Sequence, residues 1–549
     1  MDGAPEEHDE SARALAAECA KQWPTMLARK APAASSPAAK APAGDGEMAP
    51  AAEVNEADTH TIKVDVLRTR GNHPAFGPTM RERLRSLLTE FCHKELVRYM
   101  QGLHEVAAVF AYIEESASGF DGSEKSEDAT LACFTAFVRT FMPCFYDGES
   151  FVILHITLLF FRQLLLYHLP HLHNQLEEMG VAPVVYATPW FITLFAHKTP
   201  LHVVMRLWHE YIRRGDPTFV PFLAVATMEL EKQAFLDAEE DDFRNAVDRT
   251  KITSLEKLQA VWKAAENLYT RTPKSFTFRM SKVLTQVRQQ LQEKTNTNWT
   301  QSVLARADQE RRLALLAREA VAQHARVSSE VAAVPAPNLP PLRVLLLDVR
   351  PKAAFDAEHL PQALHFYPPC LQRLALVSSG SQRAERLAAA LKQAMAEVGD
   401  LVLRKDSKPQ LASPSNAEHA ALGAEVFQAL QGAASEAWGE AWLSESQASH
   451  LAILGGEADW DAAQLCKANG AVAALFELLT EQLCMPRVSV VLGGAQALHR
   501  EAEKRGLKVM TSESSSPYGN DKLRTFLSGG AKAFASFRDR AKANFASDA

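Results

Sequence analysis

A helical spacing of apolar side chains runs with little interruption through residues 59–280, and it constrains the fold more than any other feature of the chain. Large apolar residues recur three and four positions apart, for example at Leu84, Leu87, Leu88 and Phe91. This spacing is typical of amphipathic helices that pack on one another. We therefore expect this span to form an all-α domain.

A different pattern begins at residue 342. The run LRVLLLDV, residues 342–349, is apolar almost throughout and contains β-branched side chains, which is typical of a buried parallel strand. Strand and helix patterns alternate after it, so we expect an α/β domain. A chain of 549 residues is also too long for a single core, which agrees with at least two domains.

These patterns divide the chain into five parts. We expect a disordered leader at 1–57, an all-α domain at 58–280, a helical connector with a Pro-rich linker at 281–340, an α/β domain at 341–508, and a flexible tail at 509–549. The leader is rich in Ala, Pro, Ser and Gly, although residues 11–27 have a short helical pattern. The tail carries a basic amphipathic helix, which either lies on an anionic membrane or packs on its own domain. The role of an insertion at 378–449 is not indicated.

Composition narrows the classes of function. The net charge of -7 argues against a general nucleic-acid binder, because that role needs a basic surface. The seven cysteines are scattered and never in CxxC spacing, which indicates neither a disulfide framework nor a zinc site and fits a reducing compartment.

The start of the chain has no apolar core of a secretory signal. Residues 151–167 are interrupted by Arg162, so we expect a buried helix there rather than a membrane span. The expected location is cytoplasmic, with protein partners.

Two short motifs carry the candidate chemistry. The first contains Ile62, Asp65, Arg68 and Thr69, and the second contains Tyr99, Gln101 and Gly102. A GTPase active site can be completed from outside by an arginine, which neutralises charge on the γ-phosphate, and by an amide, which orients the attacking water. Arg68 and Gln101 are our candidates for these two groups.

The two motifs, IxxDxxRT and YxQG, resemble the dual-finger signature of TBC domains, the activating proteins of Rab GTPases. Further similarity follows at residues 186–195 (YATPWFITLF), at Leu207-Trp208 and at residues 271–276 (RTPKSF); His209 stands where the family usually has aspartate. The resemblance implies an all-α fold that docks a Rab GTPase, and it implies no cofactor of its own, because the partner GTPase would hold GTP and magnesium.

In this resemblance Arg68 and Gln101 are catalytic, and Asp65, Thr69, Tyr99 and Gly102 support them. The alternating run Ile62, Val64, Val66 predicts that Arg68 lies where an extended segment meets a loop, from which it can reach outward. The glycine after Gln101 indicates a close approach of the backbone. The plainer interpretation is that Arg68 is a solvated surface arginine and Gln101 an amide on a helix face.

The α/β part resembles rhodanese domains through Asp348-Val349-Arg350, Phe355, the EHLP run at 358–361 and the double glycine at 493–494. An active rhodanese needs a cysteine after its central strand, in a loop whose amides bind an anion. The corresponding strand here, residues 451–454, is followed by Gly455, Gly456 and Glu457. We therefore expect no sulfurtransferase activity.

A TBC domain followed by a rhodanese-like module without the cysteine resembles a TBC subfamily of adaptors at the trans-Golgi network. That resemblance implies retrograde transport from endosome to Golgi, with golgins and endosomal sorting proteins as partners and peripheral contact with Golgi and vesicle membranes. Two hypotheses follow. The chain either activates a Rab GTPase through Arg68 and Gln101, or it is a non-catalytic scaffold that binds golgins.

Overall fold

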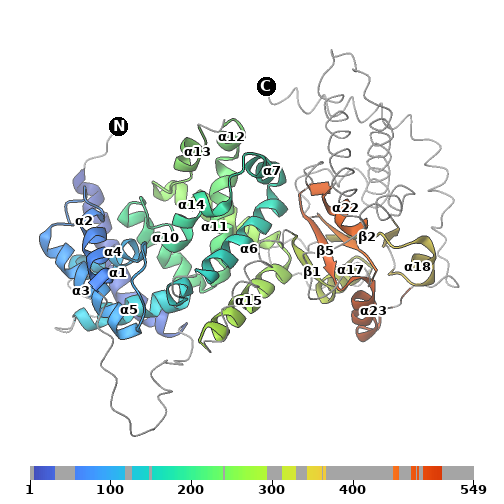
Figure 1. The fold of residues 1–549 in the computed structure, drawn as a ribbon, viewed down its shortest axis with the longest axis horizontal. Coiled ribbons are helices and arrows are strands. Elements are labelled where there is room, and N and C mark those ends of the chain that lie inside the picture. Colours follow the sequence, from blue (N-terminus) through green and yellow to red (C-terminus); the bar gives the residue numbers. More distant parts are fainter. Residues whose placement is uncertain are drawn as a thin grey trace, which may run out of the picture. The chain divides into compact units, whose positions relative to one another are not determined.

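The computed structural model describes residues 5–30, 56–117, 126–147, 151–238, 242–292, 312–328, 343–360, 363–365, 449–456, 471–477, 479–480, 486–507 and 509. They divide into two compact units (Figure 1). The first unit takes its described residues from 1–165, 175–269 and 277–309, and the second from 166–174, 270–276 and 310–549. None of the helices in these ranges combines the length and apolar character that crossing a membrane requires.

The helical part of the chain contains no strand among its described residues up to Gln292, which confirms the predicted all-α fold. Its elements are, in order, α1 (Pro5–Ala28), α2 (Glu56–Arg68), α3 (Pro78–Glu95), α4 (Leu103–Ala117), α5 (Ser126–Phe141), η2 (Pro143–Tyr146), α6 (Val152–His168), α7 (Pro170–Glu178), α8 (Pro183–Tyr186), α9 (Thr188–Ile192), α10 (Leu201–Arg214), η4 (Pro217–Phe219), α11 (Val220–Leu230), α12 (Lys232–Leu236), α13 (Phe243–Arg249), α14 (Leu255–Thr270) and α15 (Lys274–Gln292).

Helix α4 lies at the centre of the first unit. Every side chain from Leu103 to Ile113 is buried, and α1, α3 and α5 pack against this helix. Four aromatic rings meet at the centre of the core: Trp23, Phe110, Phe137 and Trp208. The first turn of α4 begins directly after the YxQG motif, so a buried helix anchors that motif.

Helix α1 corrects the predicted disordered leader. Residues 5–28 are helical, and α1 packs on α4 and α10 with Trp23 and Leu27 buried. The small buried residues of its inner face, Ala12, Ala16 and Cys19, give only a weak apolar signal in the sequence. The predicted boundary at residue 58 therefore falls inside a unit that already includes the N-terminal helix.

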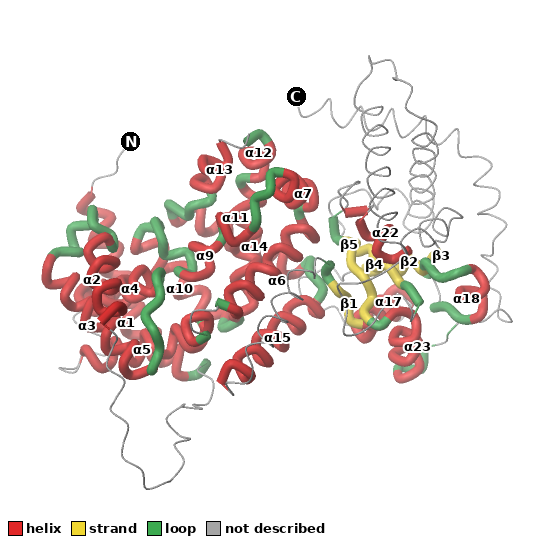
Figure 2. The backbone as a smooth tube through the Cα atoms, viewed as in Figure 1, coloured by secondary structure: helices red, strands yellow, loops and turns green. Residues whose placement is uncertain are grey.

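The second unit contains a parallel sheet of five strands in the order β1-β5-β4-β2-β3 (Figure 2). The strands are β1 (Ala314–Leu316), β2 (Arg343–Asp348), β3 (Leu364–His365), β4 (Ser449–Leu454) and β5 (Val488–Leu492). The helices described in this part are α17 (Ala317–Ser328), α18 (Lys352–Ala357), α22 (Ala471–Glu477) and α23 (Gly494–Lys504). The strands predicted at 342–349, 451–454 and in the closing run from 487 are present.

The sheet begins earlier in the chain than predicted. Strand β1 and helix α17 lie inside the expected connector at 281–340, and β1 pairs with β5 through Ala314 and Val490. The apolar strand is only three residues long and charged residues flank it, which explains why it resembled a connector helix. Residues 270–276 also belong to this unit, where Glu319 accepts hydrogen bonds from the backbone amides of Lys274 and Ser275.

Five predictions lie outside the described residues. They concern the disordered leader from residue 31 to 55, the Pro-rich linker, the insertion at 378–449 up to the start of β4, the Glu457 position, and the basic helix of the tail.

Candidate functional site

Helix α2 carries the first motif and ends at Arg68. Ile62, Asp65 and Val66 are buried on one side of this helix, whereas Val64 and Leu67 are exposed. The prediction that Arg68 follows an extended segment is therefore wrong. The alternating run misled it because positions 62 and 66 are also one helical turn apart, and the burial follows the helical period.

Arg68 is anchored but accessible. Its Nη2 lies 2.6 Å from Oδ1 of Asp65, and its side chain is 53% exposed while that of Asp65 is 4% exposed. Thr69 closes the end of the helix, because its hydroxyl donates a 2.7 Å hydrogen bond to the carbonyl of Asp65. One terminal nitrogen of the Arg68 guanidinium is thus held by a buried carboxylate, while the side chain remains half exposed.

The turn that carries the second motif is bound to the same helix. The guanidinium of Arg98 donates two hydrogen bonds to Asp58, at 2.8 and 2.9 Å, and holds the pKa of that carboxyl below its usual range. The backbone amide of Tyr99 donates to Asp58 at 3.2 Å, and its hydroxyl donates to Oδ2 of Asp65 at 2.7 Å. The structure therefore brings the IxxDxxRT and YxQG motifs together, as expected.

Gln101 is exposed at the tip of this turn, and Gly102 follows it with a φ of 105°. A Cβ at Gly102 would lie 3.0 Å from Cδ1 of Ile192, at the end of α9. The close backbone approach expected at this glycine is present. It fixes the turn against α9 and leaves the Gln101 side chain on the surface.

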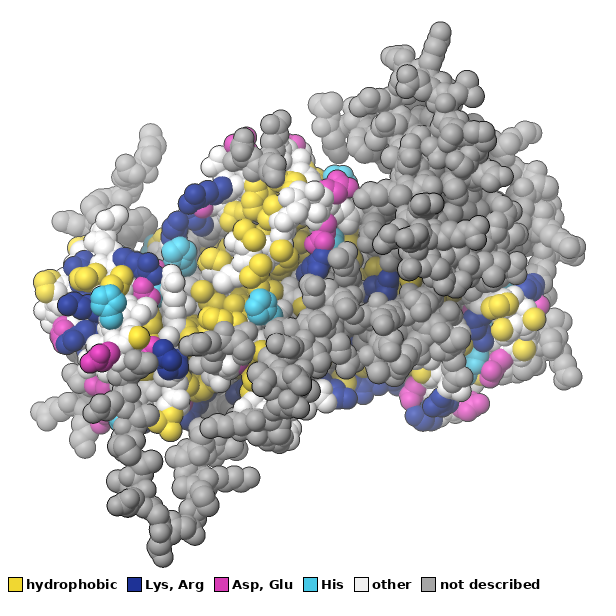
Figure 3. Space-filling view, viewed as in Figure 1, with side chains coloured by type: hydrophobic (Ala, Val, Ile, Leu, Met, Phe, Trp, Pro, Cys, Tyr) yellow, Lys and Arg dark blue, Asp and Glu magenta, His cyan; other side chains and the backbone are white. Residues whose placement is uncertain are grey.

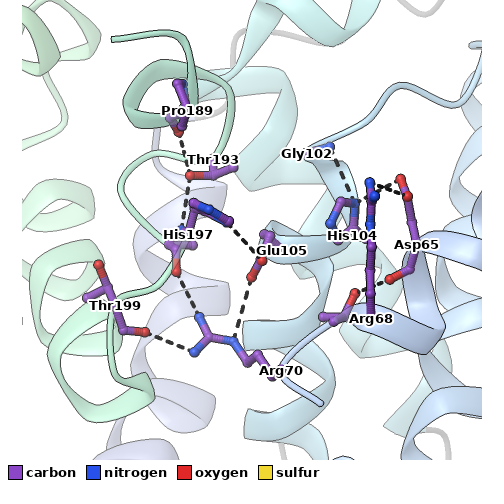
Figure 4. A network of polar contacts seen from close by, with 12 residues as sticks. Asp65, Arg68, Arg70, Gly102, His104, Glu105, Pro189, Thr193, His197 and Thr199 are labelled. Atoms are coloured by element: carbon purple, nitrogen blue, oxygen red, sulfur yellow. Dashed lines mark hydrogen bonds and ion pairs between the residues drawn. The ribbon is translucent and has the colours of Figure 1, made fainter. Parts of the chain in front are cut away.

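His104 lies between the two motifs and was not predicted. Its Nδ1 is 2.9 Å from the hydroxyl of Tyr99 and 3.3 Å from Oδ2 of Asp65. The same nitrogen is 3.3 Å from the amide nitrogen of Gly102 (Figure 4). Burial lowers the pKa of His104, against the opposing effect of Asp65 and Glu105. The available sequence signal was a pair of polar residues, His104 and Glu105, directly before the apolar run at 106–113.

A second arginine near the site, Arg70, binds the backbone of the loop after α9. Arg70 donates hydrogen bonds to the carbonyls of Thr199 at 2.9 Å and Ala196 at 3.0 Å, and its Nε lies 3.9 Å from Glu105 (Figure 4). Glu105 also lies 3.2 Å from Nδ1 of His197. Burial would raise the pKa of Glu105, but His197 and Arg70 hold it below its ordinary value. Arg70 is a structural clamp, which leaves Arg68 as the arginine that can reach outward.

The run at 186–195 approaches the start of α4, because Ile192 lies next to Gly102. Trp208 is fully buried and donates its indole N–H to the carbonyl of Leu194 at 2.9 Å. Thr193 accepts from the amide of His197 at 3.1 Å and donates to Pro189 at 2.6 Å. These bonds hold the loop that receives Arg70, so this part of the motif helps to position the site.

The second unit has its own polar cluster at the end of β2. Asp348 is fully buried and pairs with Arg350, whose Nη2 also donates to the carbonyl of Glu358 at 2.7 Å. His499 of α23 lies 2.9 Å from the Glu358 carboxylate, and His365 lies 3.0 Å from the carbonyl of Arg350. The DxR and EHLP residues that suggested the second resemblance therefore contact one another.

The predicted loop after β4 is described only for Gly455 and Gly456. Gly455 accepts a hydrogen bond of 2.9 Å from the amide of Ala495 in the first turn of α23. A Cβ at Gly494, whose φ is 58°, would lie 2.7 Å from the same carbonyl oxygen. The first turn of α23 is thus packed against the backbone of this loop. In the part of the chain that the structure describes, no cluster of three His, Cys, Asp or Glu side chains has a geometry that would hold a metal ion.

Comparison with known proteins finds a family match in the part of the chain that contains both motifs. Residues 20–236 match the Rab-GTPase-TBC domain family, a range that begins inside α1 and ends in α12. The human TBC domain-containing protein kinase-like protein is 29% identical over 187 residues, which is 34% of this chain and 19% of that protein. TBC1 domain family member 4 of the mouse is 31% identical over 202 residues, covering 36% of this chain and 14% of that protein.

Two solved structures match at low identity. The Ypt/Rab-GAP domain of Gyp1p is 14% identical with a TM-score of 0.33, over 46% of this chain and 80% of that one. A Chlamydomonas flagellar RabGAP TBC domain is 17% identical with a TM-score of 0.33, over 48% and 85%. This chain aligns with less than a fifth of the length of the curated relatives named above. The match to the Rab-GTPase-TBC domain family covers residues 20–236, which is less than half of the chain.

Proposed function

We propose that the TBC domain of this chain activates a Rab GTPase and so regulates vesicle traffic. The observation that carries the proposal is the arrangement around Asp65. One oxygen of this buried carboxylate pairs with the half-exposed Arg68, and the other accepts from Tyr99, two residues before the exposed Gln101. An arginine and an amide on neighbouring, mutually bonded segments are what a GTPase needs from a partner acting in trans.

In the proposed reaction Arg68 neutralises the negative charge that develops on the transferred γ-phosphoryl group, and Gln101 orients the attacking water. The partner GTPase holds GTP and magnesium, so this chain needs no cofactor. Asp65 forms the ion pair that orients Arg68, and the Thr69 hydroxyl binds the carbonyl of Asp65 where α2 ends. Gly102 has no side chain, which lets the turn approach Ile192 at the end of α9. Arg70 has no part in the chemistry, because its donors are used by backbone carbonyls.

The test is multiple-turnover GTP hydrolysis by a panel of Rab GTPases. At least one Rab should be accelerated by the native protein, and Arg68→Ala should lower that acceleration by roughly 10³-fold or more, the usual effect of an arginine finger. Gln101→Ala should also lower it. Arg85→Ala, at an exposed arginine of α3, is the matched control and should leave the rate unchanged. If no Rab in the panel responds to the native protein, the catalytic proposal fails.

Exposed apolar side chains beside Arg68 favour a second candidate, a scaffold. Val64 and Leu67 of α2 are 45% and 55% exposed. Figure 3 shows apolar side chains among basic and acidic ones over the end of the first unit formed by α2 and α3. Such a mixed surface suits a protein partner whether or not hydrolysis occurs. In this candidate the domain binds golgins, and the protein acts as an adaptor on the cytoplasmic side of the trans-Golgi network and endosomal vesicles.

The architecture proposed for the scaffold resembles TBC domain family member 23, with an inactive rhodanese-like module after the TBC domain. The parallel sheet and the contacts of Asp348, Arg350 and Glu358 support this second module. Endosomal sorting proteins are further proposed partners. Pull-down with golgin N-terminal segments tests the scaffold: binding should survive Arg68→Ala and weaken in Leu67→Asp. Absence of binding by the native protein would exclude golgins.

A further inference from the structure

The imidazole of His104 touches both halves of the proposed catalytic site. Its Nδ1 is 3.3 Å from the backbone nitrogen of Gly102, next to Gln101, and 3.3 Å from the Asp65 carboxylate that pairs with Arg68. The hydroxyl of Tyr99 lies 2.9 Å from the same nitrogen. The side chain of His104 is only 7% exposed, so water does not replace these contacts easily.

The bond from Gly102 requires a neutral ring. The single hydroxyl proton of Tyr99 is given to Asp65, so no proton lies between Tyr99 and Nδ1 in this state. The amide of Gly102 can only donate, so Nδ1 must offer its lone pair, and the proton of the neutral ring then resides on Nε2. The hydroxyl of Tyr99 donates to Asp65, which leaves the carboxylate fully available to Arg68 on its other oxygen. In this state the turn that bears Gln101 is tied through Gly102 to α4.

Protonation of the ring changes both contacts at once. An Nδ1–H can no longer accept from Gly102, and it faces Oδ2 of Asp65 as a competing cation beside Arg68. A buried amide without its acceptor destabilises the turn, and the added charge weakens the Arg68 pair.

The charged and titratable groups around His104 come from four parts of the first unit. Asp65 and Arg68 lie on α2, Tyr99 on the turn, Glu105 on α4, and His197 on the loop that follows α9. The two carboxylates favour protonation, whereas burial, Arg68 and His197 oppose it. Because burial has the largest effect, the pKa of His104 is below its ordinary value, and the neutral ring prevails near pH 7.

We propose that His104 is a positioning residue that aligns the Gln101 turn with the Asp65–Arg68 pair, and that acidification disengages it. Activation of the Rab would therefore decline on acidification through this chain and not only through the GTPase. The catalytic part of this inference rests on the proposed function. The link between His104 and Gly102 does not, and can be measured without any GTPase.

The first experiment follows stimulated GTP hydrolysis by a responsive Rab between pH 5 and pH 8, with the intrinsic rate of the Rab subtracted at each pH. His104→Asn is the informative variant, because an asparagine Oδ1 can take the place of Nδ1 as an acceptor and does not titrate. It should keep activity at pH 7.5 within about threefold and lose the acidic decline, whereas His104→Ala should lose about tenfold at every pH. His93→Asn, at an exposed histidine of α3, should keep the native profile.

The second experiment uses the full chain alone, with nitrogen-15 in histidine and glycine. In the native protein the amide of Gly102 should titrate together with the His104 ring, and in His104→Asn it should not move. That result supports the link even if no Rab responds, in which case only the proposed catalysis fails. A Gly102 amide that is insensitive to His104 titration overturns the inference, as does an acidic decline of hydrolysis that persists in His104→Asn.

Discussion

The hydroxyl of Tyr99 donates a 2.7 Å hydrogen bond to Asp65, a residue 34 positions earlier in the chain. The same carboxylate holds Arg68 through its other oxygen, and both Asp65 and Tyr99 are buried. One short polar contact therefore fixes the spacing between the helix that ends in the arginine and the turn that bears the glutamine. Burial and the nearby carboxylate raise the pKa of Tyr99, so its hydroxyl stays a donor throughout the accessible pH range.

Replacement of Tyr99 by phenylalanine should lower the free energy of unfolding by about 1–3 kcal/mol, because a buried carboxylate oxygen loses its donor while the ring still fills its site. Urea denaturation measures the change. In a double-mutant cycle with Asp65→Asn, the two effects should not add, since both variants act on the same bond. Additive effects, or a change within the error of the measurement, would show that this bond contributes little.

The two neighbouring arginines should respond differently to removal. Arg70→Ala should lower the free energy of unfolding by about 3–5 kcal/mol, because it leaves the buried Glu105 without its cation and two carbonyls without a donor. Arg68→Ala should change it by only about 1 kcal/mol, because Arg68 is half exposed and the buried Asp65 keeps its hydrogen bond from Tyr99. Thermal or urea unfolding of both variants decides the matter. Equal losses would contradict the assignment of Arg70 as the clamp.

Local periodicity made most of the first unit predictable, because its helices are long and their apolar faces repeat at three and four residues. It failed at Arg68, where a short run satisfies both the helical and the extended pattern. The helical conformation is stabilised by buried contacts of Asp58 and Asp65 with Arg98 and Tyr99. Such contacts join residues 34 to 41 positions apart, and no local pattern contains them.

The elements that the sequence analysis missed share one property: their burial depends on distant partners. Helix α1 buries small side chains against α4 and α10, and β1 is three residues long and is defined by pairing with β5. His104 and Arg70 look like ordinary polar residues until the fold supplies Gly102, Thr199 and Ala196 as their partners. The candidate site could be located from its two motifs, but its supporting contacts could not.

Gly102 should not tolerate a side chain. Its φ of 105° is costly for any residue with a Cβ, and that atom would lie 3.0 Å from Ile192. Gly102→Ala should lower the free energy of unfolding by about 1–3 kcal/mol. Adding Ile192→Ala should remove the clash but not the backbone cost, so the double variant should recover only part of what the glycine substitution loses. Full recovery would mean that the backbone conformation is not strained by alanine. Chemical denaturation of the single and double variants measures both the cost of the clash with Ile192 and the cost of the backbone conformation.

Helix α1 should be required for the stability of the first unit. Trp23 is fully buried among Phe110, Phe137 and Trp208, so Trp23→Ala should cost about 3–5 kcal/mol of unfolding free energy. Gln22→Ala, one position earlier on the exposed side, is the matched control and should cost less than about 1 kcal/mol. Tryptophan and far-UV signals of unfolding would report the difference. Native stability in Trp23→Ala would show that α1 is dispensable.

Two buried histidines should make the second unit sensitive to acid. Burial lowers the pKa of His168 and of His450 to about 3. Below the ordinary value of 6.5 the unfolded chain binds protons that the folded chain does not, so stability is complete above that pH and falls as the pH decreases. Between pH 6.5 and pH 5 the loss of unfolding free energy should be about 2 kcal/mol for each histidine.

His450→Asn removes one of these groups and should flatten the decline between pH 7 and pH 5, even if it lowers stability at pH 7. His171→Asn, an exposed position, should leave the slope as it is. Unfolding curves at several pH values test this, and a slope unchanged by His450→Asn would mean that protonation of His450 does not drive the acid response.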